Sequence, residues 1–219
     1  MKRFIDLSHT VEHGMITYKG LPAPIICDYL SREDSRGRYE PAGTEFQIGK
    51  IEMIANTGTY IDAPFHRYAD GKDLSELALE KLANLEAIAV RADFKNGIEV
   101  GKNFFESIPV KGKAVLVNTN WSKFWRTDAY FENHSFLTEE AAIYLRDNGA
   151  VLVGIDSHNI DDTRGKRRPV HSTLLKSEII IAEHLCSLDQ LPDSGFTFTA
   201  TPPKVKGMGT FPVRAYATF

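Results

Sequence analysis

Short apolar runs separated by polar turns dominate the pattern along this chain. Each run is only four to five residues or slightly longer and is rich in Val, Ile, Leu, Ala or Phe, which favours strands over core helices. The pattern therefore predicts a strand-rich protein. The runs are residues 3–7, 87–92, 114–117, 151–155, 179–182, 196–200 and 213–217.

One helix stands out against this background, beginning after Thr138. Thr138 is a good N-cap, Glu139 and Glu140 complement the helix dipole, and Gly149 is a typical C-terminal glycine. Residues 74–82 carry leucines at a spacing that predicts a second short helix or helical turns. Apolar strands combined with helices predict an α/β fold with a central mixed β-sheet covered by helices.

The first quarter of the chain is more polar and irregular. Residues 15–28 contain several prolines and glycines and predict a loop. Residues 31–43 are charged, which favours a solvated surface loop, with a mobile flap over a site as the alternative. Residues 44–55 alternate like a strand, but the phase slips between Ile48 and Ile51, which indicates a bulge or a tight hairpin.

The stretch 56–66, directly after this alternation, concentrates polar side chains. Pro64 excludes a helix interior and biases Ala63 toward an extended backbone, so Asp62 and His66 are expected on a rigid loop at a strand end. A carboxylate and an imidazole can serve as metal ligand and general base. The alternative is structural: Asp62 caps the loop and His66 is a hydrogen-bonded, partly buried histidine.

His171 and Glu183 form a second candidate pair. His171 lies at the start of a predicted short helix, and Glu183 follows an apolar strand. Each residue alone has an ordinary structural explanation. Together with Asp62 they would form a carboxylate–imidazole–carboxylate set, which suits one divalent metal ion with open coordination positions.

Composition limits the function classes. The 219 residues fit a single domain spanning 1–219, and a hydrophobic content of 42% is ordinary for a globular protein. A net charge of −3 gives no general attraction to nucleic acid or to an anionic membrane. The two cysteines, Cys27 and Cys186, do not indicate a disulfide scaffold, so a cytoplasmic location is expected. No run approaches the ~20 apolar residues of a membrane-spanning helix.

Aromatic and basic residues supply further candidates for substrate binding. Trp121 and Trp125 follow a predicted strand, and they are either core residues or walls of an apolar pocket for an aromatic ligand. The basic cluster 164–168 ends at Arg168. Such a cluster is usually a solvated face, but one arginine could bind a substrate carboxylate through two hydrogen bonds.

Taken together, these motifs resemble the kynurenine formamidase (arylformamidase) and cyclase family of metal-dependent hydrolases. That family carries His-x-Gly-Thr-His-x-Asp-x-Pro-x-His, and residues 56–66 read Asn-Thr-Gly-Thr-Tyr-Ile-Asp-Ala-Pro-Phe-His. The resemblance covers nearly the whole chain. It extends to further motifs in the same order, at residues 5–9, 154–157, 171–175, 181–185 and 212–215.

The resemblance implies roles for individual residues. Asp62, His171 and Glu183 match metal ligands of the family, and His66 matches its catalytic histidine. Asn56 and Tyr60 replace two ligand histidines of the motif, which puts a two-metal site in doubt. An oxygen-rich site with one histidine leans toward manganese or magnesium, with zinc possible.

The resemblance also implies a function and an assembly. It predicts the swivelling β/β/α fold, a homodimer or homotetramer, and hydrolysis of an amide, lactam or ester with His66 as general base and acid, as in tryptophan catabolism. The residues that it suggests for binding an aromatic small-molecule substrate are Asn56, Tyr60, Phe65, Trp121, Trp125 and Arg168. Two alternatives stay open, a catalytically silent small-molecule binding protein without a metal and a non-hydrolytic cyclase.

Overall fold

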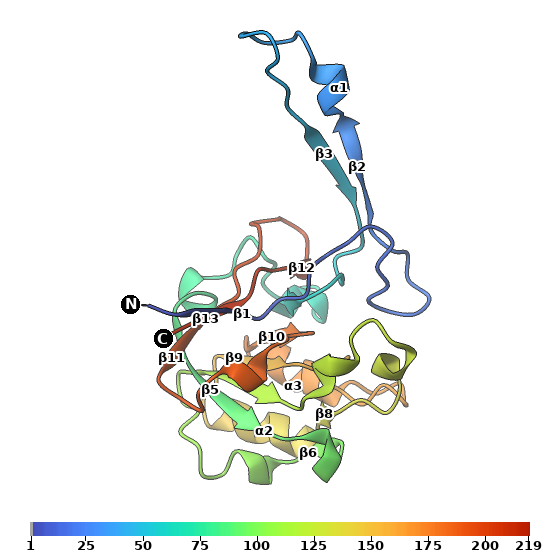
Figure 1. The fold of residues 1–219 in the computed structure, drawn as a ribbon. Helices are drawn as coiled ribbons and strands as arrows, with labels where there is room; N and C mark the ends of the chain where they lie inside the picture. Colours follow the sequence, from blue (N-terminus) through green and yellow to red (C-terminus); the bar gives the residue numbers. More distant parts are fainter. Residues whose placement is uncertain (1) are drawn as a thin grey trace.

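A nine-stranded mixed sheet forms the body of the molecule in the computed structural model, which describes residues 2–219 (Figure 1). The strand order is β1-β13-β11-β5-β7-β9-β10-β4-β12. These strands are β1 (Phe4–Asp6), β4 (Tyr60–Asp62), β5 (Leu85–Arg91), β7 (Ala114–Asn118), β9 (Leu152–Ile155), β10 (Ile180–Glu183), β11 (Phe196–Thr199), β12 (Thr210–Pro212) and β13 (Tyr216–Thr218).

Strand direction changes across this sheet in a way that builds the site. The four central strands β5, β7, β9 and β10 are parallel. β4 then pairs antiparallel with β10, and β12 pairs antiparallel with β4. The register places Tyr60 opposite Glu183 and Asp62 opposite Ile181, so residues far apart in sequence become cross-strand neighbours.

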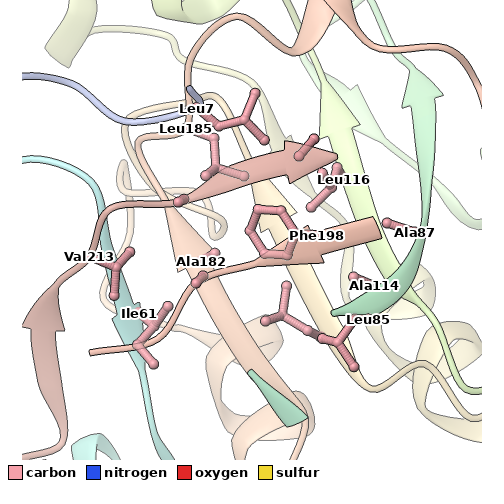
Figure 2. Close-up of a cluster of buried hydrophobic side chains, with 14 of the residues drawn as sticks. Leu7, Ile61, Leu85, Ala87, Ala114, Leu116, Ala182, Leu185, Phe198 and Val213 are labelled. Atoms are coloured by element: carbon pink, nitrogen blue, oxygen red, sulfur yellow. The ribbon is translucent and has the colours of Figure 1, made fainter. Parts of the chain in front are cut away.

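Helices cover one face of the sheet, while the curled remainder of the sheet encloses a second core. α2 (Glu139–Asp147) and α3 (Pro169–Lys176) pack on a face that includes Val115, Val153 and Ile181. Alternate residues of the same strands, such as Leu116 and Ala182, point into the other core, where they meet Phe198 from β11 (Figure 2). Alternation along each strand therefore fills both cores. This is the α/β fold with a helix-covered mixed sheet that the pattern predicts.

Besides the nine-stranded sheet, the molecule has a long arm that projects away from the body (Figure 1). It consists of the antiparallel pair β2 (Ile25–Leu30) and β3 (Ile48–Glu52), with the one-turn helix α1 (Arg32–Ser35) toward its tip. The prediction of a loop over residues 15–28 is thus wrong at its end. The phase slip corresponds to a bulge, but the register shift lies between Asp28 and Leu30 of the partner strand, and β3 itself is continuous.

One other expectation needs correction: of the run 213–217, only Tyr216 and Ala217 lie in a strand, β13, because β12 already ends at Pro212. Residues 74–82 form a 3₁₀ turn at Leu79–Lys81, which is the helical turn that was one of the two forms expected there. The remaining elements are short: β6 (Glu99–Val100) pairs with β8 (Phe136–Leu137). The other 3₁₀ turns are Pro64–His66, Phe94–Asn96, Lys102–Phe104, Trp121–Phe124, Asp128–Phe131 and Leu188–Gln190.

Within residues 2–219, the helices are all too short or too polar to cross a lipid bilayer.

Candidate metal and active site

The antiparallel pair of β4 and β10 supplies two fully buried carboxylates. Asp62 is the last residue of β4 and Glu183 the last of β10. Thr210 of β12, paired directly with Asp62, donates its hydroxyl to Asp62 Oδ1 at 2.5 Å. The other oxygen of the same carboxylate, Oδ2, is buried and has no hydrogen-bond partner among residues 2–219.

His171 reaches these carboxylates from the first turn of α3. Asp161, also buried, fixes this helix start by accepting hydrogen bonds from the backbone N–H groups of Val170 and His171, at 2.8 and 3.0 Å. Its Oδ2 also lies 2.6 Å from His171 Nδ1. Nδ1 therefore carries the proton that Asp161 accepts, and Nε2 is directed at the carboxylates.

The distances around His171 Nε2 match those between ligands of one metal ion. Asp62 Oδ2 lies 3.6 Å from this nitrogen and Glu183 Oε1 lies 3.7 Å from it. Two donor atoms about 2.1 Å from a metal in a tetrahedral arrangement would lie about 3.4 Å apart. Asp161 behind the imidazole completes the carboxylate–histidine arrangement that commonly orients metal-binding histidines. The residues present therefore fit a divalent ion.

A related set of possible ion ligands lies in the same place among residues 2–219. Asp62, His66 and His171 each offer one ligand atom, and these atoms lie within 4.8 Å of one another. Glu183 is outside that set but contacts His171 as closely as Asp62 does. His171 Nε2 and the two carboxylate oxygens beside it describe the site better, because the nearest nitrogen of His66 contacts Asp62 through Oδ1, which Thr210 already occupies.

Three buried carboxylates surround a single imidazole, and the electrostatics reflect this. Burial opposes ionisation of His171, but Asp161, Asp62 and Glu183 outweigh it and raise the pKa of His171 to about 10. Burial also raises the pKa of Glu183 to about 7, with His171 opposing the rise. For Asp62, burial is outweighed by His171 and His66, which lower its pKa. The cluster thus requires positive charge at one point, supplied by a proton or by a cation.

His66 is the exposed member of the site. Its Nδ1 lies 2.9 Å from Thr210 Oγ1 and 3.5 Å from Asp62 Oδ1, and its side chain is 35% exposed. The 3₁₀ turn Pro64–His66 is held by close packing against Gly71 and Gly209. A Cβ atom at Gly209 would come within 2.5 Å of His66 Cα, and one at Gly71 within 2.8 Å of Pro64 Cβ. His66 therefore lies between solvent and the buried carboxylates.

Glu183 is held from its other side by two phenols. Tyr60 donates to Glu183 Oε2 at 2.5 Å, and the Tyr18 hydroxyl lies 3.3 Å from the same oxygen and 2.7 Å from the Tyr60 hydroxyl. Oε1 accepts from the backbone N–H of Ile160 at 2.7 Å. Tyr60 thus contacts a proposed ligand directly, although its role in binding a substrate stays a prediction.

The other substrate-binding candidates differ in their placement. Trp125 is half-buried and stacks on His9, with ring centroids 4.0 Å apart, on the side of the site where Tyr18 lies. Trp121 is buried, donates to the backbone carbonyl of Tyr130, and packs on Phe94 and Phe124. Its contacts therefore indicate a core residue.

Arg168, Phe65 and Asn56 complete that set. The Arg168 guanidinium donates to three backbone carbonyls of its own loop, those of Asp162, Gly165 and Arg167. These hydrogen bonds use the guanidinium to hold the loop. Phe65 lies in the same turn as His66, half-buried. Asn56 is half-buried too, and in the described part of the chain its side chain makes no hydrogen bond to Asp62, His171 or Glu183.

Three residues of the site were not singled out by the sequence reasoning. Thr210 has no distinguishing spacing, because its partner Asp62 lies 148 residues away, whereas Asp161 lies only 10 residues before its partner His171. Tyr18 lies in a segment whose prolines and glycines indicate only a loop. A weak signal existed for Asp161, which follows His158 closely after an apolar strand.

Comparison with known proteins shows the family of the chain. Residues 5–162 match the family model described as "Putative cyclase". The chain belongs to this cyclase family. The matched region includes β4 and the turn that carry Asp62 and His66.

Individual relatives are enzymes with related names. A kynurenine formamidase of Bacillus cereus is 29% identical over 213 residues, which covers 97% of this chain and 95% of the relative. A solved structure described as a potential metal-dependent hydrolase with cyclase activity is 25% identical, with a TM-score of 0.79, and covers 100% of this chain and 98% of its own. An isatin hydrolase bound to the product analogue thioisatinate shares the fold, with a TM-score of 0.83 at 20% identity over 100% of this chain and 92% of its own.

Proposed function

We propose that this protein is a metal-dependent hydrolase that cleaves a carbon–nitrogen bond other than a peptide bond, in a small aryl formamide or lactam. The observation that carries the proposal is the spacing of Asp62 Oδ2 and Glu183 Oε1 around His171 Nε2, with Asp62 Oδ2 left without a partner. Relatives named kynurenine formamidase and isatin hydrolase support the same reaction class.

In this proposal Asp62, His171 and Glu183 hold the ion, and Asp161 orients the imidazole. When bound, a manganese, zinc or magnesium ion would polarise the substrate carbonyl and make a neighbouring water more acidic. His171 must be neutral to act as a ligand, so the two positive charges of the ion take the place of its proton. The oxygen-rich ligand set favours manganese or magnesium over zinc.

His66 is the residue proposed to move protons. It is exposed enough to meet a substrate, and Thr210 fixes the position of its Nδ1. In the first step it removes a proton from the attacking water, and in the second it delivers that proton to the departing nitrogen. Positioned proton transfer of this kind typically contributes about 10²–10⁴-fold to a rate.

An aromatic substrate is the finer part of the proposal. Tyr18 and Trp125 are half-buried. The Tyr18 hydroxyl lies 3.3 Å from Glu183 Oε2, and Trp125 packs near the same histidine as Tyr18, His184. A flat aryl ring could pack there, with its amide group directed toward His66. The names of the relatives, which refer to aromatic compounds, support this choice.

The test of the proposal is hydrolysis by the purified protein and by His66→Ala. We expect the parent, supplied with manganese, to hydrolyse N-formylkynurenine or isatin, and the variant to lose about 10²–10⁴-fold in kcat while it retains the metal. His13→Ala is the matched control, since His13 is exposed and bonds the backbone N–H of Ile26. Equal rates for His66→Ala and the parent would refute the assigned role.

A second candidate is a metal-free protein that binds a small molecule without hydrolysing it. The observation that favours it is the raised pKa of His171, about 10, because a protonated imidazole can balance the carboxylates without an ion. Elemental analysis and a melting curve with added manganese separate the two candidates. A metal-free protein with an unchanged melting temperature would support the second.

We also propose a homodimer or homotetramer in a reducing compartment such as the cytoplasm. The arm supports the assembly, since Ile25, Tyr29, Ile48 and Ile51 are 46–77% exposed on it. Exposed apolar side chains in such density commonly mark an interface. Two free cysteines support the compartment. Sedimentation of the parent and of a Tyr29→Ser, Ile51→Ser double variant tests the assembly.

A further inference from the structure

We propose that Tyr60 and Tyr18 form a directed hydrogen-bond chain that fixes Glu183 as a ligand with a single free oxygen, and that this makes the site discriminate against calcium. The inference rests on the proposed metal site and concerns residues that position a ligand. The chain runs from Tyr130 through His184, Tyr18 and Tyr60 to Glu183, with successive contacts of 2.8, 3.3, 2.7 and 2.5 Å.

The direction of the chain follows from counting protons. Tyr60 donates its only hydroxyl proton to Glu183 Oε2. The 2.7 Å contact between the two phenol oxygens needs a proton between them, and only Tyr18 can supply it. The oxygen of Tyr18 is then left to accept, and the two donors near it are Asn159 Nδ2 at 3.2 Å and His184 Nε2 at 3.3 Å.

The state of His184 agrees with this count. Each ring nitrogen of His184 faces one phenol, Nδ1 the Tyr130 hydroxyl at 2.8 Å and Nε2 the Tyr18 hydroxyl at 3.3 Å, so one nitrogen can donate while the other accepts. If Nε2 donates to Tyr18, Nδ1 must accept, and Tyr130 is the donor at 2.8 Å. With Tyr18 donating to Tyr60 at 2.7 Å in preference to the His158 carbonyl at 3.1 Å, the protons from Tyr130 to Tyr60 all point toward Glu183.

The consequence lies in the geometry of Glu183. Oε2 receives Tyr60 at short distance and has Tyr18 beside it, so it is turned away from the ion position. Oε1 remains, near His171 Nε2, and its only other partner in the described residues is the N–H of Ile160. A carboxylate held in this way binds an ion through one oxygen.

Ligation by one oxygen separates cations by size. Calcium takes six to eight oxygens at about 2.3–2.6 Å and commonly uses both oxygens of a carboxylate, whereas magnesium demands about 2.0–2.1 Å with few protein ligands. A rigid glutamate with one free oxygen cannot expand its coordination to suit calcium. The phenols thus determine which ion the same three ligands accept.

The experiment is calorimetric titration of the metal-free full chain with MnCl₂ and with CaCl₂. We compare the parent, Tyr60→Phe, Tyr18→Phe and Tyr216→Phe, a control on β13 whose ring packs near Phe4. We expect Tyr60→Phe to weaken manganese binding about 10–100-fold, as loss of a residue that orients a ligand typically does. Tyr18→Phe should act in the same direction by less, and the ratio of manganese to calcium affinity should fall at least 5-fold in Tyr60→Phe.

The outcomes are distinguishable from failure of the proposed function. If the parent binds neither ion, the metal site itself is refuted. If the parent binds manganese and Tyr60→Phe retains both its affinity and its manganese-to-calcium ratio within 2-fold, the inference is overturned while the metal site stands. If Tyr60→Phe does not fold, the manganese and calcium affinities of Tyr18→Phe decide the test. The Tyr18 side chain lies in a loop and is only half-buried, and its hydroxyl belongs to the same chain of hydrogen bonds.

Discussion

Asp62 and Glu183 are both fully buried carboxylates at the ends of neighbouring strands, yet their surroundings are opposite in kind. Asp62 has one oxygen that receives Thr210 and a second that receives nothing. Glu183 has donors on both oxygens, from Ile160 on one side and Tyr60 on the other. The first carboxylate is open toward His171, and the second is closed on the side of the phenols.

The difference in hydrogen bonding between the two carboxylates indicates which of them lacks a partner that a metal ion could supply. An unpaired buried polar group costs about 1–3 kcal/mol, and more when it is charged. Under the proposed function, the open oxygen of Asp62 faces the ion. The donors on Glu183 hold that carboxylate rigidly, so that Oε1 stays near His171 Nε2. Substitutions at either carboxylate or at its supporting residues test whether the two carboxylates differ in this way.

The largest effect is expected for Asp62→Asn. The substitution keeps the shape of the side chain but removes the charge and the free anionic oxygen. We expect manganese affinity to fall more than about 100-fold, beyond the usual loss for residues behind the ligands. The rise in melting temperature on adding manganese should disappear. Asp128→Asn is the control, since Asp128 is 91% exposed in a surface ion pair.

A smaller loss is expected for Asp161→Asn. This residue does not touch the ion position, but it orients His171 and accepts two backbone N–H groups of α3. We expect manganese affinity to fall about 10–100-fold, measured by the same titration. An affinity equal to that of the parent would mean that helix packing alone orients the imidazole.

The smallest effect concerns the neutral histidines behind Glu183. Burial lowers the pKa of His158 to about 3, from 6.5. The unfolded chain therefore binds a proton that the folded chain refuses, so His158 contributes stability above pH 6.5 that is lost as the pH falls toward 3. Replacing His158 with Phe should flatten the decrease of melting temperature between pH 7 and 5, by about 2 °C or more. An unchanged slope would show that other groups cause it.

Elements with strong local signals were predictable from the sequence. The helix after Thr138 begins at Glu139, where the cap accepts from the N–H of Ala141, and it ends at Asp147 shortly before Gly149. The central strands are apolar because both of their faces are buried, and they lie within two residues of the predicted runs. Where local pattern and tertiary burial agree, the sequence alone suffices.

The arm and part of the site were not predictable in this way. Ile25–Leu30 pairs with residues about twenty positions later, and prolines just before it concealed the strand. The motif residues Asp62 and His66 carry a local signal, but Thr210 reaches them only through the register of the sheet. Tyr18 reaches Glu183 only through the path of a loop. Such contacts depend on tertiary structure and have no sequence spacing.

The two glycines that flank the turn carrying His66 restrict what can change around it. Any side chain at position 209 or 71 would overlap the backbone of this turn. In a saturation library selected for activity, these two positions should return glycine almost alone, while the neighbouring surface accepts wide variation. The surface around the turn is therefore free to diverge, while the turn that carries His66 stays fixed.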